Sequence, residues 1–331
     1  MTRTLIATLA LASTLALTPR ETVGAAFDDD FATDPATRGW FATGTTRLFQ
    51  WNPTTGALHA TWDSREPNSC FARPLGVTLS RTNDFCLVFD LRLADVTPNI
   101  DPNKSSAAFQ LAVGLIRLAD ATSPSFLRGA GYCPNLLDFS FFPDPGGPWS
   151  DGPTITAVLV DDTSFGWLYE HSLVTLETNE TYRVTMAFDA EAETLRTEVW
   201  RNGTRFHTLP VTRLPAGFTD FALDHLAVCS YSDAGQFPGW EGSILAHGAV
   251  DNVSFAPWLP VKRLTALPVA GGCGLRFDSH AGWLYTLERT TDWRQWQAVT
   301  AAQPGTDAPL TLTDPTPPGG NAGYRVRAAK P

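Results

Sequence analysis

The sequence is poor in charged residues and lacks an apolar run long enough to cross a membrane. Only 18% of its 331 residues are Asp, Glu, Lys or Arg, and the formal net charge is −10. An acidic chain repels phosphate backbones and anionic lipids, so the attraction that dominates nucleic-acid binding is missing. A membrane-spanning helix needs about 20 apolar residues. We therefore expect neither a nucleic-acid partner nor membrane insertion.

One short apolar run stands at the start of the chain. Leu5–Leu17 follows Arg3 and precedes the small residues Gly24–Ala26. A basic residue, a short apolar segment and small residues before a cleavage point are typical of a secretory signal peptide. We expect residues 1–26 to be removed and the protein to be secreted, to the periplasm, the cell surface or the medium.

Cysteine is scarce and odd in number. The five cysteines are Cys70, Cys86, Cys133, Cys229 and Cys273. Because no C-x-x-C or spaced His pair accompanies them, a structural zinc site is disfavoured. In a secreted protein we expect one or two disulfides, and the spacing leaves their pairing open.

Long helical periodicity is also missing, whereas short alternating segments recur between turn residues. Asp84–Leu93 has a large apolar residue at every second position, which predicts a half-buried strand. Tyr182–Phe188 and Leu195–Val199 predict a hairpin, and Asn202-Gly203 predicts a tight turn into another strand. Further strands are expected at Ala108–Leu118, Pro153–Val160, Thr204–Leu209, Asp220–Val228 and His247–Phe255. The pattern predicts an all-β fold in which two antiparallel sheets form a sandwich.

A proline-rich joint divides the chain. Proline cannot donate to a strand ladder, so pairing should stop at Ala256–Pro260. We place a first domain at residues 27–256, a linker at 257–261 and a small β-sandwich module at 262–331.

Three short motifs carry a resemblance to a known superfamily. They are Phe27–Phe31, the hairpin from Tyr182 to Gly203, and Val250–Val253. Together they resemble the concanavalin A-like lectin/glucanase superfamily, and in particular the laminin-G-like jelly rolls of secreted bacterial proteins. The C-terminal segments Trp283–Arg289 and Tyr324–Val326 resemble fibronectin type III or immunoglobulin-like modules. The resemblance implies a jelly-roll sandwich that binds glycans in many members and cuts polysaccharides in others.

Calcium is the one cofactor that the resemblance implies. Jelly rolls of this kind often hold Ca²⁺ where the first strand meets the last, through hard oxygen ligands. Asp28, Asp30 and Asp251 occupy the matching positions. The alternative is that the aspartates at the N-terminus form a solvated turn.

Catalytic motifs are absent from the sequence. The E-x-D-x-x-E run that the resemblance implies for its glycosidases does not occur. Asp161-Asp162 is expected at a solvated turn, and Asp224-His225 has no identifiable nucleophile beside it. Glu170 and Glu241 are the carboxylates available to a polysaccharide-cleaving alternative, a glycoside hydrolase or lyase.

Two loops combine aromatic and polar residues, the composition that binds the apolar faces and hydroxyl groups of sugars. The candidate ligand-binding residues are Trp149, Asp151, Tyr231, Asp233, Gln236 and Trp240. The alternative is that these aromatics cap the ends of the sandwich. We expect Trp40, Trp51, Trp62, Trp167 and Trp200, which lie in or beside strand patterns, to belong to the core.

These observations favour a secreted, non-catalytic, lectin-like protein that binds a glycan or an extracellular matrix. The main alternative is a structural or adhesive surface protein that contacts cell-surface or matrix proteins.

Overall fold

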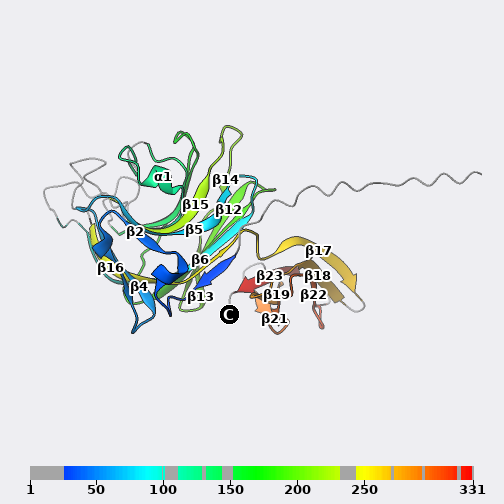
Figure 1. Cartoon of the computed structure of the whole chain (residues 1–331). Coiled ribbons are helices and arrows are strands. Elements are labelled where there is room, and N and C mark those ends of the chain that lie inside the picture. Colours follow the sequence, from blue (N-terminus) through cyan, green and yellow to red (C-terminus); the bar gives the residue numbers. More distant parts are fainter. Residues whose placement is uncertain are drawn as a thin grey trace, which may run out of the picture.

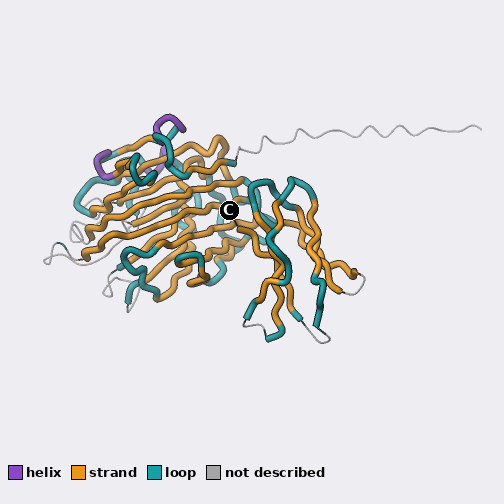
Figure 2. Tube along the Cα trace, turned by 90° about the horizontal axis from the view of Figure 1, so that it is seen from below, coloured by secondary structure: helices purple, strands orange, loops and turns teal. Residues whose placement is uncertain are grey.

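The computed structural model describes residues 26–98, 100, 111–128, 132–143, 152–231, 244–269, 272–292, 295–318 and 322–329. The expected signal peptide lies outside these residues, apart from Ala26. The described chain forms two large antiparallel sheets and a smaller C-terminal module beside them (Figure 1). Strands make up most of the trace and helical turns are few and short (Figure 2). The all-β prediction is confirmed.

The first sheet has nine strands in the order β13-β12-β11-β6-β16-β4-β3, with β1 paired to β16 and β14 paired to β12. Their bounds are β1 Phe27–Asp29, β3 Phe49–Asn52, β4 Ala57–Asp63, β6 Phe85–Pro98, β11 Thr181–Asp189, β12 Thr194–Arg201, β13 Thr204–Thr208, β14 Thr212–Arg213 and β16 Ile244–Ala256.

The second sheet has seven strands in the order β10-β9-β8-β7-β15-β5-β2. Their bounds are β2 Phe41–Thr43, β5 Ser69–Leu79, β7 Leu111–Ile116, β8 Leu136–Phe142, β9 Thr154–Val160, β10 Trp167–Leu173 and β15 Leu223–Ser230. The helical turns are η1 Pro35–Arg38, η2 Thr46–Leu48 and α1 Leu118–Ala121. No helix in the described part of the chain has the length and hydropathy needed to span a membrane.

Side chains that alternate along the strands build the core between the two sheets. In the hairpin β11–β12, Tyr182, Val184, Met186 and Phe188 are fully buried and join the main core cluster. Val184 lies opposite Val199, which is the register that the hairpin prediction requires. The intervening residues of both strands therefore face away from the core.

The prediction for Asp84–Leu93 is wrong in one respect, because β6 is buried on both faces. Phe85 and Leu87 enter the main core as expected, but Cys86 and Val88 on the other face are also buried. They belong to a cluster that includes Trp283 of the C-terminal module. A partner about two hundred residues away thus covers the face that local alternation assigns to solvent.

The C-terminal module consists of two small sheets. One contains β17 Lys262–Val269, β18 Gly272–Asp278 and β22 Pro309–Thr313, and the other contains β19 Leu284–Thr290, β20 Gln297–Ala298, β21 Gln303–Pro304 and β23 Gly323–Ala329. At the junction Lys262 forms an ion pair with Asp84 at the start of β6. Tyr285 donates to the carbonyl oxygen of Pro260 at 2.8 Å. Polar and apolar contacts therefore both fix the module to the large sandwich.

The aspartate run at the N-terminus contains a buried carboxylate. Asp29 is 1% exposed and accepts hydrogen bonds from the backbone N–H of Phe31 and, at 2.7 Å, from Nε1 of Trp40. It also forms ion pairs with Arg38 and with Arg73, the latter at 3.2 Å. Because a buried charge is tolerated only when it is paired, these donors make Asp29 a fixed point between β1, η1 and β5.

Replacing Asp29 should therefore destabilise the fold strongly. Asp29→Ala leaves two arginines and an indole N–H without their acceptor, and we expect the free energy of unfolding to fall by about 3 kcal/mol. Equilibrium urea unfolding measures the loss. The matched control is Asp30→Ala, because the Asp30 side chain is 66% exposed; its cost should stay below about 1 kcal/mol. Equal losses of unfolding free energy in the two variants would contradict the assignment of Asp29 as the buried, paired carboxylate.

Candidate functional site

Most of the ligand-binding residues expected from the sequence lie outside the described residues. Trp149, Asp151, Asp233, Gln236 and Trp240 are in this group. Tyr231 is described, and it is 2% exposed with its ring stacked on Phe126 at 5.9 Å. Burial raises the pKa of Tyr231 well above its usual value. Its ring lies within the protein and offers no open platform for a sugar.

Tyr231 belongs to a closed layer on the outer face of the seven-stranded sheet. The segment between β7 and β8 carries Arg128, whose guanidinium makes a bidentate pair with Asp138 of β8 at 3.0 and 3.1 Å. Both residues are 1% exposed. Burial lowers the pKa of Arg128, but the charge and hydrogen bond of Asp138, together with the influence of Cys133 and Tyr231, outweigh burial and raise it. This buried pair holds the segment over the middle of the sheet.

The expected calcium ligands approach one another without forming a ligand set. Pairing of β1 with β16 brings Asp28 opposite Ser254, and the charge of Asp30 acts on Asp251. Asp30 Oδ1 accepts from the N–H of Ala32, and Asp251 Oδ1 accepts from the N–H of Asn252. Within the described residues no three His, Cys, Asp or Glu side chains group closely enough to hold an ion. The calcium site at Asp28, Asp30 and Asp251 therefore stays a prediction.

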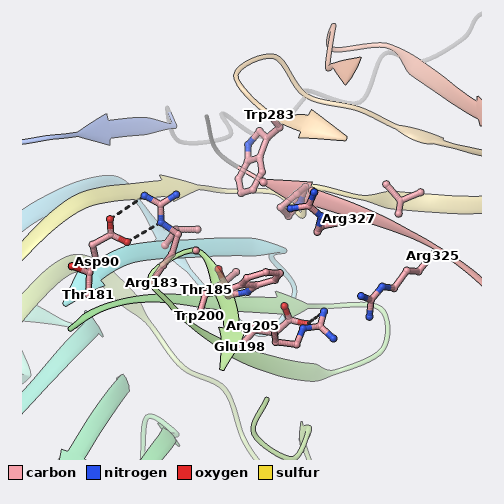
Figure 3. Close-up of a pocket in the computed structure, with 16 residues that line it drawn as sticks. Asp90, Thr181, Arg183, Thr185, Glu198, Trp200, Arg205, Trp283, Arg325 and Arg327 are labelled. Carbon is pink, nitrogen blue, oxygen red and sulfur yellow. Dashed lines mark hydrogen bonds and ion pairs between the residues drawn. The ribbon is translucent and has the colours of Figure 1, made fainter. Parts of the chain in front are cut away.

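The described chain instead contains an arginine-lined pocket of about 470 Å³ between the nine-stranded sheet and the C-terminal module. Its floor is a row of outward-facing residues that crosses four neighbouring strands. In the strand register, Asp90 of β6 lies opposite Arg183 of β11. Arg183 lies opposite Trp200 of β12, and Trp200 lies opposite Arg205 of β13. Figure 3 shows these side chains along one side of the pocket.

Hydrogen bonds and ring contacts fix the side chains of the floor. Arg183 makes a bidentate pair with Asp90 at 2.8 and 3.0 Å, and hydrogen bonding to Asp90 raises the pKa of Arg183. The Arg205 guanidinium lies 5.4 Å from the ring centroid of Trp200 and 3.7 Å from the Glu198 carboxylate. A separation of 3.7 Å exceeds a hydrogen bond, so Arg205 is held less firmly than Arg183.

A bulge in β16 completes the setting of Asp90. The register of β16 on β6 shifts between Asp251 and Ser254, and Asn252 there has a φ of 47°. Asparagine tolerates this left-handed conformation better than most residues. Its side-chain amide donates to Asp90 Oδ2 at 2.9 Å. Both oxygens of Asp90 are thus engaged by donors, from Arg183 and from Asn252.

The C-terminal module forms the opposite wall. Trp283, Pro260 and the strand β23 line it, and Figure 3 shows Trp283, Arg325 and Arg327 across the pocket from Arg183 and Trp200. Arg325 and Arg327 pair with Glu288 at 2.6 and 2.9 Å. Four guanidinium groups and two carboxylates, Asp90 and Glu198, therefore line the pocket, although the chain as a whole is acidic.

The sequence carries a signal for this floor in the alternation of β12. Trp200 was expected in the core, but alternation with the buried Val199 places it on the outer face, where it is half-buried. Arg183 and Glu198 share that face by the same rule. Trp40 and Trp62 are core residues as expected, at 3% and 0% exposed.

The other titratable motifs have structural surroundings. His225 Nδ1 lies 2.6 Å from Asp224 Oδ1, which also accepts from the N–H of Leu118. Asp161 is 2% exposed; burial raises its pKa, but hydrogen bonds from Thr163 and others outweigh burial and hold it below its usual value. A carboxyl with a lowered pKa, as at Asp161, is unsuited to act as a catalytic acid.

Comparison with known proteins gives structural matches only. No family model matches the chain, and no curated protein matches it. Lectin II from Ulex europaeus superposes with a TM-score of 0.47 at 14% identity, over 71% of this chain and 99% of the lectin. The Lotus tetragonolobus seed lectin gives 0.46 at 11% identity, over 70% and 97%. An alginate lyase gives 0.36 at 12% identity, over 65% and 86%. Values this low carry no conclusion about ligand or activity.

The surroundings of Asp251 predict a pH dependence of stability. Burial and then the charges of Asp90, Asp30 and Asp29 raise the pKa of Asp251 from 3.8 to about 6. Between about pH 4 and 6 the folded chain therefore binds more protons than the unfolded chain, and this contribution to stability falls as the pH rises through that window. Because Asp251 is partly exposed to solvent, we discount the effect to roughly 1 kcal/mol.

Asp251→Asn should thus raise the free energy of unfolding at pH 7.5 by roughly 1 kcal/mol and change it much less at pH 4, where the folded chain already holds Asp251 in its neutral form. Urea unfolding at the two pH values, in chelator, measures this difference. If Asp251→Asn is less stable than the wild-type protein at pH 7.5 only when calcium is added to both, the result would instead indicate that Asp251 binds the ion.

Proposed function

We propose that this protein is a secreted, non-catalytic carbohydrate-binding protein whose glycan lies in the pocket between β11–β13 and the C-terminal module. The observation that carries the proposal is Trp200, a half-buried indole flanked by the Asp90–Arg183 pair and by Arg205. The signal-peptide pattern at Leu5–Leu17 supports secretion.

The chemistry of the pocket matches that of a sugar. The C–H face of a pyranose packs against an aromatic ring, while its hydroxyl groups need donors and acceptors fixed around that ring. Trp200 supplies the ring, and Asp90, Glu198 and the hydroxyl groups of Thr181 and Thr185 line the same pocket. A volume of about 470 Å³ lies within the range of small-ligand pockets.

The charge of the pocket favours a glycan that carries carboxylate or sulfate groups. Four guanidinium groups line it, and Asp90, Glu198 and Glu288 pair with them, which leaves an excess of one positive charge. Guanidinium binds carboxylate and sulfate oxygens through paired N–H donors. Arg205 is the group most easily redirected to a ligand, because its contact with Glu198 is long, at 3.7 Å.

The state of Asp90 supports binding rather than cleavage. Both of its oxygens accept hydrogen bonds in the structure, from Arg183 and from Asn252. A carboxylate held in this way suits orientation of a ligand better than transfer of a proton. Glu170, one of the two carboxylates available to the enzymatic alternative, lies on β10 of the other sheet, and Glu241 is outside the described residues.

Removal of the indole tests the site. Trp200→Ala should weaken binding of an acidic oligosaccharide about tenfold, since stacking on one aromatic ring contributes about 1 kcal/mol or slightly more. Isothermal titration with oligouronates and sulfated oligosaccharides measures this change. The matched control is Tyr169→Ala, an aromatic that is 48% exposed on the other sheet and should not alter affinity. Unchanged affinity in Trp200→Ala, or no glycan bound by the wild-type protein, would refute the proposal.

The contribution of charge has its own test. Arg205→Gln should weaken binding of the same ligand roughly fivefold, equivalent to about 1 kcal/mol. The loss of affinity between about 50 and about 300 mM salt should also be smaller in the variant than in the wild-type protein. These two concentrations lie on either side of the one that gives a screening length of ~10 Å. Arg201→Gln is charge-matched: Arg201 also lies over an aromatic ring, that of Phe206, but does not line the pocket. Equal effects of the two substitutions would show that net charge alone, and not the pocket, attracts the ligand.

A further inference from the structure

Two cysteines lie directly opposite each other on neighbouring strands. Cys70 of β5 pairs with Cys229 of β15 in the antiparallel register, and both are buried, at 5% and 2% exposed. Directly opposed residues have Cα atoms about 4.5 or 5.5 Å apart, depending on their place in the ladder. Both values lie within the range of about 4.4–6.8 Å that a disulfide spans.

Their side chains share one face of the seven-stranded sheet. Cys70 and Cys229 belong to the same apolar cluster, together with the small residues Ala72, Ala112 and Ala227. Small neighbours leave the two thiols in contact with one another. All five cysteines are reduced in the structure.

The two thiols already interact. A hydrogen bond from Cys229 lowers the pKa of Cys70, against the opposing effect of burial, and the Thr43 hydroxyl lies 3.0 Å from Cys70 Sγ. Hydrogen bonding to Cys70 and burial raise the pKa of Cys229. Cys70 is therefore the thiol that ionises first and acts as the nucleophile.

The remaining cysteines are placed differently. Cys133 belongs to the same cluster but lies on the segment between β7 and β8, where its N–H donates to Ser164 Oγ at 2.7 Å. Cys86 and Cys273 contact the separate cluster at the C-terminal module. Of the five, only Cys70 and Cys229 are strand partners in the described ladders.

We propose that Cys70 and Cys229 form a cross-strand disulfide when the protein meets a disulfide oxidant. The Cys70 thiolate attacks one sulfur of the oxidant and releases one thiol, which leaves a mixed disulfide on Cys70. The Cys229 thiolate then attacks Cys70 Sγ and releases the second thiol. The protein loses two protons and two electrons, and the oxidant is reduced to two thiols.

The edge of the sheet gives the oxidant a route to Cys70. Only β2, a strand of three residues, covers β5 on that side, and Thr43 of β2 is the residue opposite Cys70. A strand this short is held by few ladder bonds, so it opens more readily than the sheet centre.

Peptide mapping tests the disulfide directly. The wild-type protein is incubated with oxidised glutathione, treated with iodoacetamide in denaturant and digested without reductant. We expect a peptide that joins Cys70 to Cys229 and two fewer alkylated cysteines than in the reduced protein. The melting temperature of the oxidised protein should exceed that of the reduced protein by at least about 5 °C, because the crosslink closes a long loop in the unfolded chain.

Two substitutions serve as controls. Cys229→Ala should abolish the crosslinked peptide, whereas Cys133→Ala should leave it intact. The wild-type map decides the matter even if a variant does not fold. Alkylation of all five cysteines after oxidation, or a link from Cys70 or Cys229 to Cys133 instead, would overturn the proposal.

Discussion

The apolar contact between β6 and the C-terminal module is the interaction on which the candidate site depends. Cys86 and Val88 of β6 pack into one cluster with Trp283, Phe277 and Leu287 of the module. This contact buries the second face of a central strand and sets β23 on the other side of the pocket from β11 and β12. Without it, the row from Asp90 to Arg205 would be an open polar surface. With it, the same row is the floor of a pocket.

The two outer faces of the sandwich are covered in different ways. On the seven-stranded sheet, the segment that carries Arg128 closes the face, and its ion pair with Asp138 is buried. On the nine-stranded sheet, a separate module covers part of the face and leaves space beneath it. Closely packed interiors leave little room for ligands. The described structure thus leaves a pocket at the junction with the module, lined by Trp200 and four arginines.

Local alternation was enough to predict several of the strands and, for the hairpin β11–β12, the face that enters the core. The register of Val184 on Val199 and the burial of Phe85 and Leu87 follow from a period of two and from the turn residues alone. The outer faces could not be assigned in this way, since the cover of Cys86 and Val88 comes from a segment distant in sequence.

The candidate site was harder to predict for a related reason. The sequence analysis expects Trp200 in the core because large aromatics are buried on average. Alternation along β12, however, turns Trp200 to the face away from the buried Val199. Asp29 looked like one member of a solvated acidic run, because its partners Arg38 and Arg73 come from two other elements. Opposition of Cys70 and Cys229 depends on the neighbours of β5 and β15, which the order of strands along the chain does not give.

The most direct test of the pocket is hydrogen–deuterium exchange of the full chain with and without a bound acidic oligosaccharide. The pocket predicts slower exchange in two separate regions, residues 181–205 and residues 323–329, because the ligand would contact both walls at once. Protection confined to residues 141–152 and 230–242, with no change at β11, β12 or β23, would contradict it and place the glycan on the rim loops of the sandwich.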